Sequence, residues 1–330
     1  MSVGSSAWCD LERCEAVARR LSTLDVPEPK EDVPSLPFTA AEEANFWFLL
    51  AAICHQTSPV GLPALEGEVE GRRRRGWDYL LQAFRVAAAG EPALLDPATW
   101  RSFSTDRLVD LFSPLLSDPA GRAALVRDLG EGLARRGWDS ILDAGPECRF
   151  FVRDHAPNLL GVLAEFKAYS DPVEKKSVFF LALMKNCGLW RYPDDALLPA
   201  PVDYHEVRGH LRIGTVQLAA ELLHKVAAGA PVTQAEDVEI RLAVRGAIQC
   251  IARASGISTN ALHYLFWNLF RTYCVRGTPQ CGGSACAKLP PAYASVVDNG
   301  GGRECPFAPV CRSAFAPHAI DEHSVATEYY

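Results

Sequence analysis

Apolar residues recur at helical spacing along most of this chain, and no stretch shows a convincing alternation of apolar and polar residues. The pattern predicts helices over residues 10–24, 40–54, 77–89, 105–116, 120–137, 155–169 and 173–187. Residues 61–75 are expected to form a loop or a short hairpin. The predicted fold class is therefore all-α.

The later helices have recognisable start and stop signals. Thr233 and Glu236 form a capping box for a helix that Gly256 ends, and Ser258 or Thr259 caps the last long helix. One further helix is expected from residue 203 to residue 230, because its apolar positions form a single stripe. They are Val207, Leu211, Gly214, Leu218 and Leu222.

Length and charge narrow the class of protein. The 330 residues can form one large helical unit, or two lobes of about 1–150 and 151–273 followed by a tail, 274–330. A formal charge of −7 argues against a protein that coats nucleic acid nonspecifically. The longest apolar run, residues 46–54, is too short to cross a bilayer, and the first residues do not resemble a signal peptide. A cytoplasmic location without membrane contact is expected.

Asp203 is placed where an extended segment turns into a helix. Pro199 and Pro201 keep the preceding chain out of a helix, and the helical stripe begins directly after Asp203. The free N–H groups and the dipole of a helix start would keep this carboxylate ionised and fixed in place. An ordinary capping residue is the alternative interpretation.

Five of the eleven cysteines lie close together near the end of the chain, around a loop rich in glycine and proline. Such a loop has too little apolar content to order itself by burial, whereas a metal ion or cluster bound by four thiolates would order it. Zinc is the alternative to an iron–sulfur cluster, and unrelated reduced thiols are the alternative to both. These cysteines are Cys274, Cys281, Cys286, Cys305 and Cys311.

The six remaining cysteines are scattered through segments expected to be helical. They are interpreted as reduced thiols of the core or the surface. They are Cys9, Cys14, Cys54, Cys148, Cys187 and Cys250.

The end of the chain resembles the endonuclease-III-type base-excision DNA glycosylases. Cys274 and Cys281 enclose six residues and Cys305 and Cys311 enclose five, which is similar to the iron–sulfur loop of that family. The middle of this loop is longer here and contains Cys286 as an additional cysteine. Residues 202–208 are similar to the segment that holds the catalytic aspartate of that family. The family's glycine-rich helix–hairpin–helix is missing from residues 185–198.

A second resemblance covers more of the chain, from about residue 40 to its end. The queuosine salvage proteins, which release the base queuine from queuosine 5'-phosphate, have a related helical fold and carry similar segments in a similar order. Two acidic positions of that family appear here as His263 and Asn268. The similar segments include residues 45–48, 76–77, 166–190, 202–204, 239–241, 262–267 and 329–330.

Both resemblances imply an N-glycosidase with a multi-helix, DNA-glycosylase-like fold, in which Asp203 is the catalytic carboxylate. Breaking a sugar–base bond builds positive charge on the sugar, which a fixed carboxylate stabilises, and the hydrolysis itself needs no cofactor. A small nucleotide is the expected substrate, and duplex DNA is less favoured. The alternatives are a base-excision DNA glycosylase and a non-catalytic nucleotide-binding protein.

The resemblance to the queuosine salvage proteins also implies a set of substrate-binding residues. The aromatic ones are expected to stack on the base, with packing in the core as their alternative role. A solvent-exposed ion pair is the alternative for Glu239 and Arg241. The expected set is Asn45, Phe46, Trp47, Trp190, Tyr204, Glu239 and Arg241.

Overall fold

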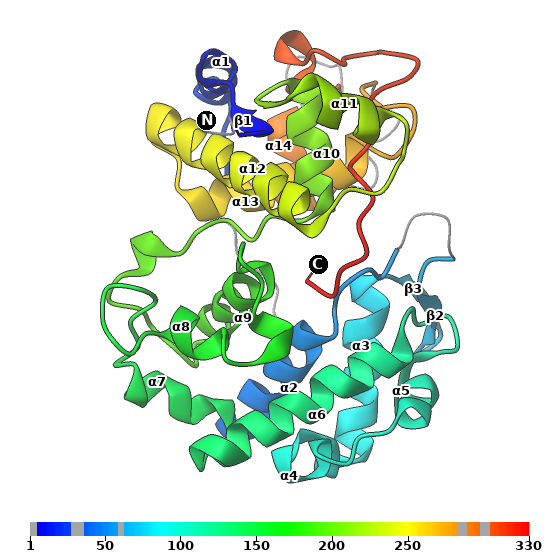
Figure 1. Cartoon of the computed structure of the whole chain (residues 1–330), viewed down its shortest axis with the longest axis vertical. Coiled ribbons are helices and arrows are strands. Elements are labelled where there is room, and N and C mark those ends of the chain that lie inside the picture. Colours follow the sequence, from blue (N-terminus) through cyan, green and yellow to red (C-terminus); the bar gives the residue numbers. More distant parts are fainter. Residues whose placement is uncertain (1–4, 28–35, 59–62, 283–288, 298–303, 330) are drawn as a thin grey trace. The chain divides into compact units, whose positions relative to one another are not determined.

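The protein is described by a computed structural model that covers residues 5–27, 36–58, 63–282, 289–297 and 304–329. Helices dominate these residues, and the strands among them are short, so the expected all-α class is confirmed at this coarse level (Figure 1). The chain divides into two compact units. Unit 1 contains Met1–Lys30 and Pro199–Thr327, and unit 2 contains Glu31–Leu198 and Glu328–Tyr330. The chain passes from unit 2 into the second segment of unit 1 after residue 198, whereas the sequence suggested a boundary near residue 150.

Unit 1 is assembled from the two ends of the chain. Its strands are β1 (Ala7–Cys9) and β4 (Val216–Leu218), which pair antiparallel with Cys9 opposite Val216. Its helices and 3-10 turns are α1 (Leu11–Leu21), α10 (Tyr204–Ile213), α11 (Ala220–Ala227), α12 (Gln234–Ser255), α13 (Thr259–Tyr273), η6 (Pro291–Tyr293), α14 (Ala294–Val297) and η7 (Ala308–Val310).

Three helices of unit 1 position the residues discussed below. Helix α10 packs against both α12 and α13, and α1 packs along α12 (Figure 1). The contact of α10 with α13 is close, because a Cβ atom at Gly209 would lie 2.1 Å from the ring of Phe270. A side chain at this position would therefore push the two helices apart.

Unit 2 is a continuous stretch of chain apart from its last residues. It contains one hairpin, β2 (Glu66–Val69) with β3 (Arg72–Arg75), in the segment expected to be a loop or hairpin. Its helices and 3-10 turns are α2 (Ala40–Ala52), α3 (Trp77–Gly90), η1 (Pro92–Leu95), α4 (Pro97–Trp100), α5 (Thr105–Phe112), α6 (Pro119–Arg136), η2 (Ile141–Asp143), α7 (Ala144–Glu147), α8 (Leu159–Leu163), η3 (Lys167–Tyr169), α9 (Lys175–Asn186) and η4 (Asp195–Leu197).

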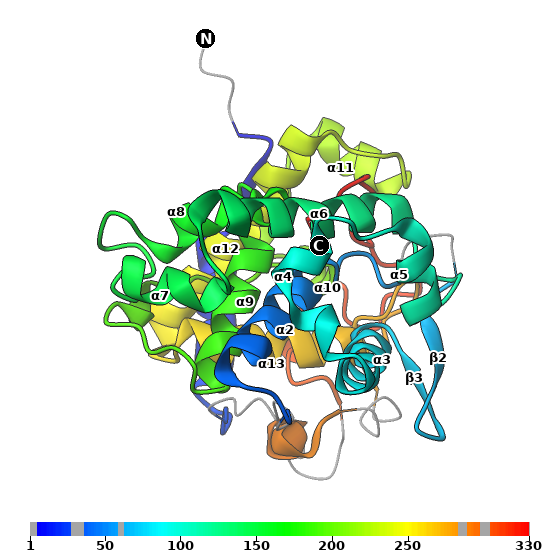
Figure 2. The ribbon, with the colours of Figure 1, turned by 90° about the horizontal axis from the view of Figure 1, so that it is seen from below.

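Helix α2 is the centre of unit 2. It packs against α3, α6 and α9, and in Figure 2 its blue ribbon lies between α9 and α3. Every residue from Ala44 to Ala52 is buried, so this helix is apolar on all sides. Phe48 stacks on Tyr169 at a ring separation of 5.0 Å, and Phe46 stacks on Phe84 at the same separation. These aromatic contacts form much of the core of the unit.

Two of the expected helices are wrong in length. The helix that follows Asp203 ends at Ile213, because Gly214 adopts φ +90° and terminates it, and β4 and α11 replace its predicted continuation. The helix expected over residues 155–169 is reduced to Leu159–Leu163, preceded by Pro157 in a turn region. The caps expected at Thr233 with Glu236 and at Ser258 are confirmed. No helix in the described part of the chain combines the length and the apolar character needed to cross a membrane.

Candidate functional site

Asp203 is the N-cap residue of α10, as its sequence context predicted. Its Oδ1 accepts hydrogen bonds from the backbone N–H groups of His205, at 2.8 Å, and Glu206, at 3.2 Å. Glu206 returns the contact, since its Oε2 accepts from the N–H of Asp203 at 3.2 Å. This reciprocal capping box holds the Asp203 carboxylate in the field of the helix N-terminus.

The second carboxylate oxygen of Asp203 faces helix α13. Its Oδ2 accepts a hydrogen bond of 2.9 Å from the indole N–H of Trp267. The carboxylate thus has donors on both oxygens while only 8% of the residue is exposed. Arg271 lies over the Trp267 ring at 4.0 Å, and Arg276 lies over the ring of Tyr204 at 5.2 Å. Two aromatic rings with arginines on their faces therefore flank the region of Asp203.

A buried acid–histidine pair continues this network. Nδ1 of His263, on α13, lies 2.8 Å from Oε1 of Glu206. Burial raises the pKa of Glu206, with a further contribution from Asp203, and the contact with His263 opposes this shift. Glu206 has no exposed surface, so it links Asp203 and His263 through a shielded carboxyl group.

Two arginines of α10 fix the segment that begins the cysteine-rich tail. Arg208 donates to the carbonyl of Cys274 and to the Glu322 carboxylate at 2.5 Å. Arg212 donates to the carbonyls of Val275, Gly277 and Ile320 at 2.8, 3.1 and 2.7 Å. Both guanidinium groups are almost completely buried. They tie the residues after α13 and the C-terminal segment to the same helix that carries Asp203.

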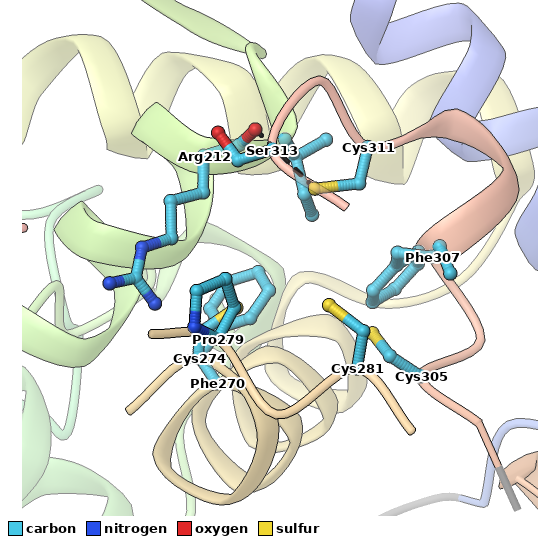
Figure 3. A pocket seen from close by; sticks show the side chains of 11 residues that line it. Arg212, Phe270, Cys274, Pro279, Cys281, Cys305, Phe307, Cys311 and Ser313 are labelled. Carbon is cyan, nitrogen blue, oxygen red and sulfur yellow. Dashed lines mark hydrogen bonds between the residues drawn. The ribbon is translucent and has the colours of Figure 1, made fainter. Parts of the chain in front are cut away.

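Four of the cysteines predicted to bind a metal line one small pocket beside α10 and α13. Figure 3 shows Cys281 and Cys305 next to each other, Cys311 on the loop above them, and Cys274 beyond Pro279. The backbone supports this arrangement, because the N–H of Cys305 donates to the carbonyl of Cys281 at 2.8 Å. The remaining wall is largely apolar, with two phenylalanines, Phe270 and Phe307.

Burial keeps two thiols of the pocket, those of Cys274 and Cys305, in the neutral form. Burial raises the pKa of Cys274 to about 12 and that of Cys305 well above the usual range, and the neighbouring sulfurs add to both shifts. A bound cation would displace these protons. In the described parts of the chain, no three Cys, His, Asp or Glu side chains are already arranged around a single ion position. Cys286, the fifth predicted ligand, lies outside the described residues.

Arg241 and Glu239 belong to two separate networks of unit 1. Arg241 pairs with Asp237, one turn earlier on α12, at 2.8 Å, and Nε2 of His323 lies 2.7 Å from the same carboxylate. Glu239 instead accepts from the backbone N–H of Ser6 at 2.9 Å. The expected alternative of an exposed Glu239–Arg241 ion pair is therefore wrong, because the Arg241 side chain is completely buried.

The residues of unit 2 that were expected to bind substrate lie in its core. The amide of Asn45 bonds to the carbonyl of Leu95 at 3.0 Å and to the N–H of Ile141 at 3.1 Å, which ties helix α2 to its neighbours. Phe46 and Trp47 have at most 1% of their surface exposed. These contacts give all three residues a structural role.

Trp190 is also in the core of unit 2, but its polar atom is unusual. Only 1% of the residue is exposed, and its ring meets that of Phe180 edge-to-face at 5.7 Å. The indole N–H is buried and has no hydrogen-bond partner among the described residues. A buried donor without an acceptor is costly, so this group is the one part of Trp190 that packing does not explain.

Sequence reasoning selected Asp203 and five cysteines of the tail as candidates but did not select the partners of Asp203. Glu206 could have been found, because an aspartate followed three residues later by a glutamate is a capping-box signature. His263 and Trp267 are four residues apart, which places them on one face of α13. Nothing in the local sequence indicates that this face meets α10.

No protein-family model matches the chain, and no curated protein matches it either.

Proposed function

We propose that this protein is an N-glycosidase that hydrolyses the base–sugar bond of a small modified nucleotide, with Asp203 as its central carboxylate. One observation carries the proposal: Asp203 is held at a helix N-terminus with donors on both oxygens, next to a buried Glu206–His263 pair. Queuosine 5'-phosphate, which would release queuine, is the substrate that the sequence resemblance favours. We also propose that the helices have the arrangement of the DNA-glycosylase family.

The chemistry requires a fixed negative charge beneath the sugar. As the bond to the base breaks, the ring becomes cationic, and a preoriented carboxylate stabilises this charge without reorganising. The capping box and Trp267 supply the preorientation of Asp203. The same carboxylate is suited to orienting the water that attacks the sugar.

The departing base needs a proton, and we assign its delivery to His263. Glu206 accepts from the Nδ1 atom of this imidazole at 2.8 Å, which fixes the orientation of the ring. Aromatic Tyr204 and Trp267, each with an arginine on its face, support binding of an anionic ligand with a flat base.

We further propose that Cys274, Cys281, Cys305 and Cys311 hold an iron–sulfur cluster, with zinc as the alternative metal. Four thiols on one largely apolar pocket are a suitable donor set for either. The group would order the tail and, through Arg208 and Arg212, the helix that carries Asp203. A cytoplasmic location is proposed as well, which the free thiols of the described cysteines support.

Purified protein is expected to release a free base from a mononucleotide, with queuosine 5'-phosphate as the first compound to test. The assay compares this nucleotide, unmodified nucleotides and lesion-bearing duplex DNA, and detects the free base by chromatography. Release from duplex DNA alone would support a base-excision glycosylase instead. Binding of a nucleotide without any release would support the non-catalytic alternative.

Anaerobically purified protein is expected to contain iron and acid-labile sulfide in stoichiometric amounts. Cys305→Ser should lose most of both, because it removes a buried thiol of the pocket, while Cys187→Ser in unit 2 should keep them and serves as the control. Zinc without sulfide would identify the alternative metal. Protein with neither would contradict the assignment.

A further inference from the structure

Three cysteines outside the tail meet at the N-terminal side of unit 1. They come from three elements: Cys9 ends β1, Cys14 lies in α1 and Cys250 lies in α12. The sulfur atoms of Cys9 and Cys14 are 3.4 Å apart, and Cys9 also has a hydrogen-bonding contact with Cys250. Nothing in the sequence groups them, and they were expected to be reduced thiols of the core or the surface.

Local structure explains why Cys9 and Cys14 touch. Asp10 is the N-cap of α1, so Cys9 precedes the cap and Cys14 is the fourth helical residue. Side chains at these two positions commonly pack together and fix the entry of the chain into a helix. Pairing of β1 with β4 and the bond from the N–H of Asp10 to the carbonyl of Thr215, at 2.9 Å, hold the entry in place. The thiol pair is therefore preformed on a rigid support.

An apolar pair would serve this packing role equally well, but these thiols differ chemically. Cys14 is only 1% exposed, whereas Cys9 is partly exposed. The hydrogen bond from Cys14, helped by Cys250 and Arg253, lowers the pKa of Cys9 to about 7 against the opposing effects of burial and Asp10. The same bond and burial raise the pKa of Cys14 far above its usual value. The partly exposed Cys9, which ionises readily, is thus in contact with the shielded thiol of Cys14.

We propose that Cys9 and Cys14 form a redox-active dithiol that hydroperoxides convert to an intramolecular disulfide. The Cys9 thiolate attacks the peroxide oxygen, the O–O bond breaks, and Cys9 becomes a sulfenic acid while hydroxide or alkoxide leaves and takes up a proton. The Cys14 sulfur then attacks the Cys9 sulfur, and the sulfenic hydroxyl leaves as water with the proton of Cys14. Together, two thiols and one hydroperoxide give one disulfide, one water and one alcohol. With hydrogen peroxide, a second water forms in place of the alcohol.

The geometry favours Cys14 over other thiols as the resolving residue. Its sulfur needs to approach Cys9 by only about 1.4 Å to reach the length of a disulfide bond. Cys250 is the competing partner, but its sulfur also accepts a hydrogen bond from the Arg253 guanidinium at 3.2 Å. The dithiol is independent of the proposed glycosidase chemistry, because none of its residues contacts Asp203 or lines the cysteine pocket.

The proposal is tested on the reduced full-length protein with one equivalent of hydrogen peroxide, followed by alkylation and peptide mapping. Arg13 separates the two cysteines, so trypsin places Cys9 and Cys14 on different peptides, and a disulfide joins residues 1–13 to residues 14–19. We expect this linked pair to be the main oxidised product. In Cys14→Ser, Cys9 should instead be trapped as the sulfenic acid by dimedone.

Two further measurements make the test decisive. Alkylation of Cys9 in the reduced protein should be half-maximal near pH 7, and Cys187, a partly exposed thiol of unit 2, is the internal reference. Cys9→Ser should abolish the linked pair and leave the iron and sulfide content unchanged. A main product that joins Cys9 to the Cys250 peptide, or oxidation of Cys9 no faster than that of Cys187, would overturn the proposal.

Discussion

Asp203→Asn is expected to lower kcat by roughly 10²-fold or more, a loss of about 2.7 kcal/mol of transition-state stabilisation. The substitution keeps the size of the side chain and removes the charge that offsets a cationic sugar. Asparagine is as good an N-cap as aspartate, so the start of α10 should persist. Base release under saturating nucleotide measures the effect.

The contact with Trp267 adds a distinct stability signature to this variant. If the asparagine oxygen keeps the backbone bonds, its NH₂ group faces the indole N–H of Trp267, and two donors meet where a donor met an acceptor. The expected cost is about 1 kcal/mol of unfolding free energy. Adding Trp267→Phe removes the indole donor, so the double variant should regain this stability while remaining inactive.

Asp203→Ala removes the helix cap together with the charge. It removes the acceptor for the N–H groups of His205 and Glu206 and should lower the unfolding free energy by about 1 kcal/mol. It should be no more active than Asp203→Asn. Full turnover in the asparagine variant would show that Asp203 only caps the helix, and it would end the catalytic assignment.

Glu322→Gln is expected to lower the unfolding free energy by about 3–5 kcal/mol, because it leaves the buried Arg208 without a charge partner. The side chains of Arg208 and Glu322 are only 2% and 3% exposed, and Arg276 binds the same carboxylate at 2.7 Å. Denaturant unfolding at neutral pH measures the change. Glu165→Gln, which breaks an exposed ion pair with Arg136, is the matched control and should cost less than about 1 kcal/mol.

Glu322 should also determine how steeply the free energy of unfolding falls at acidic pH. Burial alone would raise the pKa of Glu322, but Arg208 and Arg276 outweigh it and lower the pKa below its usual value. Its contribution is therefore present above the unfolded pKa of about 4.3 and is lost as the pH falls through the lower folded pKa. Stability measured between neutral pH and pH 3 should fall less steeply in Glu322→Gln than in the natural chain. Equal slopes would contradict this role.

Helix boundaries could be predicted where the signal is local. Ser258 and the Thr233–Glu236 box cap the helices assigned to them, because a cap depends on residues within one turn. The prediction failed at Gly214, where the apolar stripe continued beyond a glycine with φ +90°. Leu218 fits that stripe by spacing, but it lies in β4, whose partner strand is far away in sequence. Pairing between distant segments has no local signal.

The residues of the candidate site likewise include some with a local sequence signal and some without one. Asp203 and the cysteines of the tail could be selected from sequence because their neighbours in the chain are informative. The pairing of Asp237 with His323, and of Glu206 with His263, depends on how α10, α12, α13 and the C-terminal segment pack, and no periodicity reveals it. Aromatic residues of α2 were selected through resemblance, but the structure gives them a packing role in unit 2.

The divided origin of unit 1 has a consequence for synthesis of the chain. Strand β1 and helix α1 leave the ribosome before unit 2, yet their partners β4 and α12 are translated after the whole of residues 31–198. Because domains generally fold as units during translation, unit 2 can complete its core while β1 and α1 still wait for their partners. During that interval Val17 and Leu21, later buried, are exposed to solvent and to chaperones. Strand β1 and helix α1, although translated before unit 2, therefore reach their native contacts after it.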